Sequence, residues 1–115
     1  MIEQKFRLRR YRVEKVLNKG KSTKIGNFIV RYQLNKQLFN RFSIVMSRKF
    51  EKLATIRNRK KRQVYEAIRN IIKEGLAKNE HFDLVLIPYK KILSCNYNRI
   101  YQNVNDIFKY LNQKS

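Results

Sequence analysis

The side chains best suited to chemistry in this sequence are five cations among the six residues "RNRKKR" at 57–62. Arginine guanidinium groups bind phosphate oxygens through two parallel hydrogen bonds, and lysine ammonium groups act as mobile point charges. A helix that begins here adds unpaired backbone N–H donors and a partial positive charge. Because like charges at this spacing repel and destabilise an isolated helix, the block favours a phosphate-bearing partner over a merely solvated face.

Residues that commonly act as nucleophiles, general acids or metal ligands are sparse. His81 is the only histidine and Cys95 the only cysteine, and the eight acids show no spacing typical of a catalytic pair or a metal site. We therefore expect no catalytic side chain, no protein-held metal and no intramolecular disulfide.

The overall charge points to a polyanionic partner. Lys and Arg number 28 against 8 acids in 115 residues, so the formal net charge is +20 and the sequence pI is near 10.5. A protein tolerates such self-repulsion most readily when it binds a polyanion, with nucleic acid first and an anionic membrane surface second. The longest apolar run is "LVLI" at 84–87 and the basic N-terminus has no apolar segment after it, which predicts a cytoplasmic protein without a membrane span or secretory signal.

RNA is the favoured nucleic acid. The sequence shows no helix-turn-helix or zipper pattern for DNA, and a strand with one mixed face at 27–34 suits a groove for single-stranded nucleic acid. Charge alone leaves open a basic ribosomal or other structural RNA-binding protein as the alternative. A membrane-surface protein is a distant third, since the aromatic residues follow core patterns.

The first half of the chain predicts one helix and then strands. Apolar spacing at 11–19 predicts a short helix that ends at Gly20 in a left-handed conformation. Alternation predicts strands at 27–34 and 41–47, most simply an antiparallel pair, and "KSTKI" before Gly26 adds a possible edge strand.

The second half predicts a helix, a central strand and a final helix. An apolar stripe from Val64 to Leu76 predicts a long helix from about Ala54 to Lys78. The apolar run "FDLVLIPY" at 82–89 predicts a strand in the middle of the sheet, and a stripe from Ile100 to Leu111 predicts the last helix. The expected fold is a single α+β domain over 1–115, an α/β sandwich of order α-β-β-β-α-β-α with a four-stranded sheet, in which 1–10 form a flexible basic N-terminus.

The long helix positions the basic block. At 100° per residue, Asn58, Arg62, Tyr65 and Arg69 fall on one polar ridge away from the apolar stripe. Arg57 and Lys61 point toward the stripe's own side, which is tolerable only if the first turns project beyond the core or meet a partner. This arrangement favours docking of a polyanion.

Several blocks of the sequence resemble the motifs of a known family. "RNRKKR" followed by Glu66 resembles the R-N-R-x-K-R-x-x-R-E signature of the bacterial ribonuclease P protein component. The blocks at 16–35, 41–49 and 82–88 are similar, in the same order, to the family's helix-to-strand segment, its R-x-x-x-x-V-S-K-K strand and its D-x-V-x-I-x-R strand. The resemblance covers nearly the whole chain.

The resemblance implies a fold and an activity. The fold would be like that of ribosomal protein S5 domain 2. The chain would be the protein subunit of a ribonucleoprotein endonuclease that removes the 5′ leader of precursor tRNA. Its partners would be ribonuclease P RNA and precursor tRNA, with no membrane or DNA partner. The RNA subunit would carry catalysis and hold the Mg²⁺ ions, so the protein would need no metal cage.

The resemblance also assigns residues. The signature residues facing RNA would be Arg57, Asn58, Arg59, Lys61 and Arg62, and the RNA-facing helix surface would extend over Lys60, Tyr65 and Arg69. A cleft for the leader would include Val13, Leu17, Arg31 and Val45, and a basic loop would include Arg48, Lys49 and Lys52. The sequence departs from the family pattern at Tyr65, where another Arg is usual, and around Glu51, where a Gly-bearing loop has one extra residue.

Overall fold

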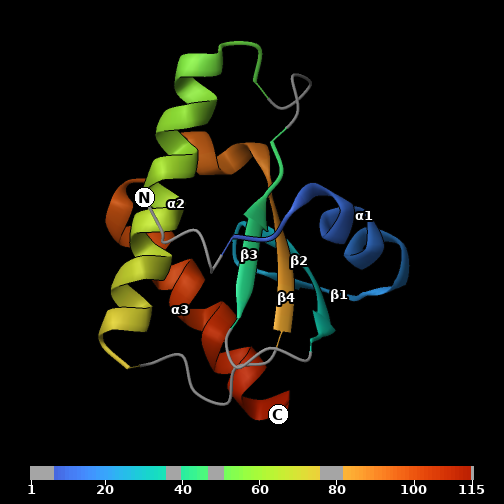
Figure 1. The fold of residues 1–115 in the computed structure, drawn as a ribbon. Coiled ribbons are helices and arrows are strands. Elements are labelled where there is room, and N and C mark those ends of the chain that lie inside the picture. Colours follow the sequence, from blue (N-terminus) through green and yellow to red (C-terminus); the bar gives the residue numbers. More distant parts are fainter. Residues whose placement is uncertain (1–6, 36–39, 47–50, 76–81, 115) are drawn as a thin grey trace.

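Eight elements build the chain in the computed structural model, which describes residues 7–35, 40–46, 51–75 and 82–114 (Figure 1). They are α1 (Arg10–Lys19), β1 (Lys21–Ile25), β2 (Phe28–Leu34), β3 (Arg41–Ile44), α2 (Ala54–Lys73), β4 (Phe82–Pro88), the 3₁₀ helix η2 (Lys90–Ser94) and α3 (Tyr97–Lys114). The order confirms the predicted α-β-β-β-α-β-α series, including the edge strand at 21–25, and adds η2.

The four strands form one mixed sheet of order β1-β2-β4-β3. β1 and β2 are antiparallel, β2 and β4 are antiparallel, and β3 runs parallel to β4. The prediction that β4 is central is confirmed. The prediction that β2 pairs with β3 is wrong, because β4 inserts between them. A strand as apolar as β4 is stabilised when neighbours cover both of its edges and helices cover both of its faces.

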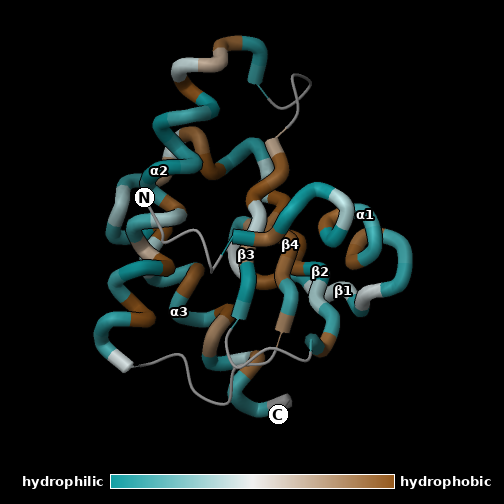
Figure 2. Tube along the Cα trace, viewed as in Figure 1, coloured by the Kyte–Doolittle hydropathy of each residue, from teal (hydrophilic) through white to brown (hydrophobic). Residues whose placement is uncertain are grey.

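Helices cover both faces of the sheet. α2 and α3 lie against one face, where the main core packs around Phe28, Phe42, Ile68, Leu84 and Phe108. α1 lies against the other face over a smaller cluster of Leu8, Val16 and Val85 (Figure 1). β4 is one of the most hydrophobic segments in Figure 2, in keeping with its place between the two layers. The sheet face toward α1 is therefore the thinly covered one.

Two glycines set helix ends, each differently from the prediction. α2 stops at Lys73 and not near Lys78, because Gly75 takes a φ of +74° and its N–H bonds to the Ile72 carbonyl. Leu76 of the predicted stripe lies outside the described residues. Gly20 is extended, with a φ of −75°, and not left-handed. Glycine is needed here because the backbone lies close to its neighbours. A Cβ at this position would lie 2.5 Å from the Val16 carbonyl oxygen and 2.9 Å from that of Tyr32.

The N-terminal segment contacts β3 where it is described. Residues 1–6 lie outside the described part. Arg7 forms an isolated parallel β-bridge with Phe42. Leu8 is buried and donates its N–H to the Phe42 carbonyl at 2.7 Å. The helix α1 then begins at Arg10. Leu8 thus fills the small cluster under α1, and the flexibility of 1–10 stays a prediction.

Candidate nucleic-acid interface

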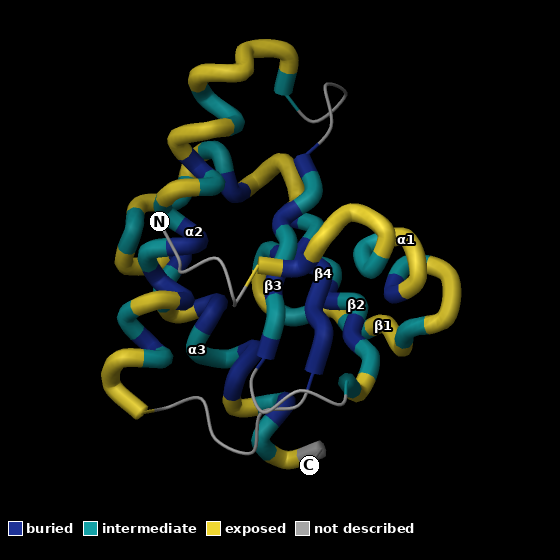
Figure 3. The backbone as a smooth tube through the Cα atoms, in the orientation of Figure 1, coloured by how far each residue is buried: buried dark blue, intermediate teal, exposed yellow. Residues whose placement is uncertain are grey.

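The N-terminal turns of α2 project beyond the end of the sheet (Figures 1 and 3). Asn58, Arg59 and Arg62 are exposed there. Neither guanidinium makes a hydrogen bond or ion pair with any residue in the described ranges. The helix begins after Leu53, which offers no side-chain cap. Unpaired guanidinium groups and uncapped N–H donors together make an anion-binding surface, here called the arginine ridge (Asn58, Arg59 and Arg62).

Arg57 supports this surface from behind. Its Nη1 donates to the backbone carbonyls of Glu51 and of Lys52, the latter at 3.0 Å. The Glu51 side chain in turn accepts the Leu53 N–H at 3.1 Å. Arg57 therefore fixes the chain that enters α2, and part of its donor capacity is already used.

Lys60 does not lie on the exposed surface of α2, where the prediction had placed it. Its residue is 8% exposed and its Nζ donates to the Cys95 carbonyl at 2.8 Å. The reason is helical geometry, since Lys60 lies four and eleven residues before Val64 and Ile71 and so extends the apolar stripe. Its ammonium ties α2 to the residue that follows η2, which holds the projecting turns in place.

Tyr65 is a second correction. It is 8% exposed and packs in the main core, with the guanidinium carbon of Arg7 5.9 Å from the ring centroid. Burial raises the pKa of the Tyr65 phenol, and the charge and hydrogen bond of Arg7 oppose that rise. The cation of Arg7 therefore lies above the Tyr65 ring.

The remaining predicted cations differ in exposure and in pairing. Lys61 is half-buried and Lys52 is exposed. Arg69 is exposed and forms an ion pair with Glu66 at 3.3 Å. Arg48 and Lys49 of the predicted basic loop lie outside the described residues. Of the predicted helix surface, Arg59 and Arg62 are thus the cations that are exposed and have no hydrogen-bond or ion-pair partner in the described part of the chain.

The four predicted cleft residues lie together on the sheet face under α1. Val13, Leu17 and Val45 pack around the small cluster that contains Val85. Arg31 on β2 pairs in register with Val85 on β4, and the even alternation of a strand directs both to this face. We call this surface the α1 cleft (Val13, Leu17, Arg31 and Val45). Its floor is apolar and its cation is Arg31.

Two arginines of this face have unsatisfied donors. The Nε atoms of Arg12 and Arg31 are buried and lack a hydrogen-bond partner among the described residues. Among the described residues, Arg31 makes one long hydrogen bond, from Nη2 to the Gly20 carbonyl at 3.5 Å. Buried donors without partners are rare and costly, and an anion would satisfy them. Sequence reasoning missed Arg12, although its place one residue before Val13 on an amphipathic helix was a usable signal.

A pocket of about 440 Å³ lies at one end of this face between α1 and the strands. Its wall includes Arg12, Lys15 and the buried ion pair of Arg41 with Asp83. Arg41 donates to both carboxylate oxygens at 2.9 Å, and Asn35 donates to one of them at 2.8 Å. The carboxylate is therefore neutralised, which leaves the local charge positive.

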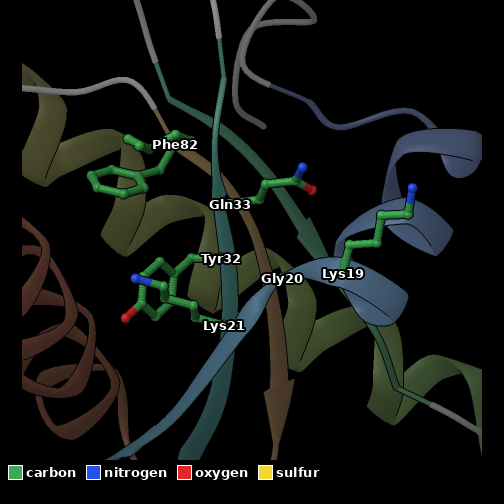
Figure 4. Close-up of a pocket in the computed structure, with 7 residues that line it drawn as sticks. Lys19, Gly20, Lys21, Tyr32, Gln33 and Phe82 are labelled. Carbon is green, nitrogen blue, oxygen red and sulfur yellow. The ribbon is translucent and has the colours of Figure 1, made fainter.

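A neighbouring pocket of about 360 Å³ lies beside the end of α1 (Figure 4). Lys19 and Gln33 lie on the side of α1, whereas Tyr32 and Lys21 lie on the other side of β2. The Tyr32 hydroxyl bonds to that of Tyr110 at 2.9 Å, and burial together with that bond raises the pKa of Tyr32 to about 12. Tyr32 thus stays neutral. Lys19 adds a positive charge at the end of α1, whereas Lys21 lies with Tyr32 on the other side of β2.

The described residues contain no group of three or more His, Cys, Asp or Glu that could hold a metal ion. None of the helices in that part of the chain is long and apolar enough to cross a membrane.

Comparison with known proteins gives one consistent family. The family model described as Ribonuclease P matches residues 3–112. A ribonuclease P protein component of Synechocystis sp. is 34% identical over 97 residues, which cover 81% of this chain and 73% of the relative. The structure of an RNase P protein from Thermotoga maritima superposes with a TM-score of 0.78 at 31% identity, covering 90% of this chain and 96% of the other. One from Staphylococcus aureus shares the fold, with a TM-score of 0.72 at 21% identity and coverage of 92% and 94%.

Proposed function

Because this chain belongs to the ribonuclease P protein family, we propose that it binds ribonuclease P RNA and the 5′ leader of precursor tRNA. In this role it assists removal of the leader, and the catalytic step belongs to the RNA subunit. The observation that supports this most strongly is the arginine ridge, where Arg59 and Arg62 are exposed near an uncapped helix start and have no partner among the described residues.

The arginine ridge and the α1 cleft suit different parts of the RNA. The arginine ridge presents charge without an apolar floor, which suits the phosphate backbone of a folded RNA. The α1 cleft combines an apolar floor with the unsatisfied donors of Arg12 and Arg31, which suits a single strand whose bases and phosphates are both accessible. We assign the folded RNA to the ridge and the leader to the cleft.

Mg²⁺ in this proposal is held mainly by RNA and substrate. The described acids suit a protein cage poorly, since Asp83 is neutralised by Arg41 and Glu66 pairs with Arg69. The protein contributes positive charge that lowers the repulsion between two RNA molecules, which reduces the ion concentration needed for assembly. The expected location is the cytoplasm, where the tRNA precursors of a bacterium are made.

Leader recognition is tested by comparing precursor tRNA with mature tRNA as ligands of the reconstituted ribonucleoprotein. We expect the protein to increase the preference for the precursor. The variant Arg31→Met should reduce that preference by about fivefold, because it keeps an unbranched apolar stem but removes the guanidinium donors. Lys109→Met removes the same charge from an exposed position on α3, which covers the opposite face of the sheet, and should leave the preference intact. Equal losses for both variants would contradict the cleft assignment.

A further inference from the structure

A pocket of about 560 Å³ lies beside the arginine ridge, between α2 and the start of α3. Four residues line it, namely Arg62, Gln63, Glu66 and Tyr97. Its volume falls within the range of sites for small organic groups. It lies on a different side of the molecule from the α1 cleft, because α2 and α3 cover the opposite face of the sheet.

Gln63 places a hydrogen-bond acceptor without a described donor in the pocket wall. Its Oε1 is buried and has no hydrogen-bond partner among the described residues. Only three described side chains have such an atom, and the other two are Arg12 and Arg31 of the α1 face. A buried amide oxygen without a donor destabilises the free protein. A ligand that brings an N–H group into the pocket removes this cost.

Tyr97 gives the pocket an aromatic wall that is held in place. Its hydroxyl accepts a hydrogen bond from Asn70 Nδ2 at 2.7 Å. Its ring lies 6.3 Å from that of Tyr101, tilted by 47°. The ring is half-buried, so a flat group entering the pocket meets a fixed aromatic surface. Stacking on such a surface is the usual way in which proteins hold unpaired bases.

Charge at the rim identifies the kind of ligand. Arg62 has no partner in the described part of the chain, whereas the Glu66 carboxylate is paired with Arg69 at 3.3 Å. A phosphate bound to Arg62 would place the attached nucleoside beside Gln63 and Tyr97, because Arg62 belongs both to the ridge and to the pocket.

We propose that this pocket binds one unpaired nucleotide of an RNA, with its phosphate on Arg62, its base against Tyr97 and an exocyclic amino group donating to Gln63 Oε1. The inference rests on the proposed function and deepens it, since the ridge then reads a base as well as the backbone. The net charge of +20 and continuity with the ridge favour RNA as the occupant. Bases that present an amino group are adenine, cytosine and guanine.

The test uses the full-length protein and two short RNA strands. In each strand abasic sugar phosphates flank a single base, which is adenine in one strand and unsubstituted purine, lacking only the amino group, in the other. We expect the wild-type protein to bind the adenine strand about fivefold more tightly, the effect of one net hydrogen bond. Both strands should share one salt dependence, because their phosphates are identical.

Variants separate the pocket from the ridge. Gln63→Leu should bind both strands equally, and its melting temperature should equal or exceed that of the wild type, since the orphan oxygen is gone. Tyr97→Phe should keep the stacking surface, and Tyr97→Leu should weaken both strands. Gln113→Leu is the matched control, because Gln113 is an exposed glutamine on α3. This variant should retain the preference for adenine.

The outcomes distinguish this inference from the function on which it rests. Equal wild-type affinity for the two strands, or no binding of either, would overturn the nucleotide pocket. If ribonuclease P RNA still bound with its salt dependence through Arg59 and Arg62, the proposed function would stand without the pocket. Loss of the adenine preference in Gln113→Leu as well as in Gln63→Leu would also overturn it.

Discussion

Replacing Arg59 and Arg62 together by alanine is expected to weaken binding to ribonuclease P RNA by a factor of about 10 to 100, because two charge-assisted phosphate contacts are lost. The slope of log affinity against log salt should become shallower by about two, one for each lost contact. Filter binding or fluorescence anisotropy over a range of salt concentrations measures both quantities. Folding should be unaffected, since both side chains are exposed and have no partner in the described residues.

The control for this experiment is the double variant Lys73→Ala with Lys109→Ala. It removes the same net charge from exposed positions at the far end of α2 and on α3. We expect the control to change affinity by no more than the general electrostatic effect, with a nearly unchanged salt slope. If both double variants weakened binding equally, the RNA would be responding to net charge and the ridge would have no special role.

Breaking the ion pair of Arg41 with Asp83 is expected to have the largest effect on stability. The Asp83 side chain is 5% exposed and that of Arg41 16%. Arg41→Ala leaves a buried carboxylate with Asn35 as its remaining described donor, and we expect the free energy of unfolding to fall by about 3–5 kcal/mol. Urea denaturation measures it. The double variant Arg41→Met with Asp83→Leu should lose much less, because it leaves no unpaired buried charge.

The exposed pair of Arg69 with Glu66 is the comparison for that result. Its side chains are 53% and 45% exposed, and Arg69→Ala should lower the free energy of unfolding by less than about 1 kcal/mol. An effect of Arg41→Ala as small as that of Arg69→Ala would mean that the carboxylate is hydrated and that the pocket wall beside α1 is open.

The order of the elements could be predicted from the sequence because it depends on local patterns. The alternation of 27–34 and the helical stripe that starts at Val64 each reflect one element and its buried face. Strand pairing is different, since nothing within β2 or β3 records that β4 separates them. The buried character of β4 on both faces was visible in its sequence, and a central strand already requires two neighbours.

The candidate site could be predicted in part for the same reason. The block at 57–62 identified the arginine ridge, and the grouping of Val13, Leu17 and Val45 was predicted from the family resemblance. Lys60 belongs to the basic block by its charge, but its position on the apolar stripe of α2 turns it toward the rest of the protein. The partners that hold it and Tyr65, the Cys95 carbonyl and Arg7, are distant in sequence.

Gln63 and Tyr97 illustrate what the sequence does not reveal. Each has an ordinary local setting, on an amphipathic helix and at the start of another. Only the packing of α2 against α3 brings the unsatisfied amide oxygen and the aromatic ring to the same pocket beside Arg62. Sites made by contacts between helices far apart in the chain depend on tertiary structure that local patterns do not specify.

Cleavage of precursor tRNA over a Mg²⁺ titration tests the central claim most directly. Ribonuclease P RNA is assayed alone and with this protein, and the protein is assayed alone. We expect no cleavage by the protein alone, and we expect the protein to lower the Mg²⁺ concentration at which the RNA removes the 5′ leader. Identical Mg²⁺ dependence with and without the protein, or leader removal by the protein without RNA, would contradict the assignment of this chain as the RNA-binding subunit of ribonuclease P.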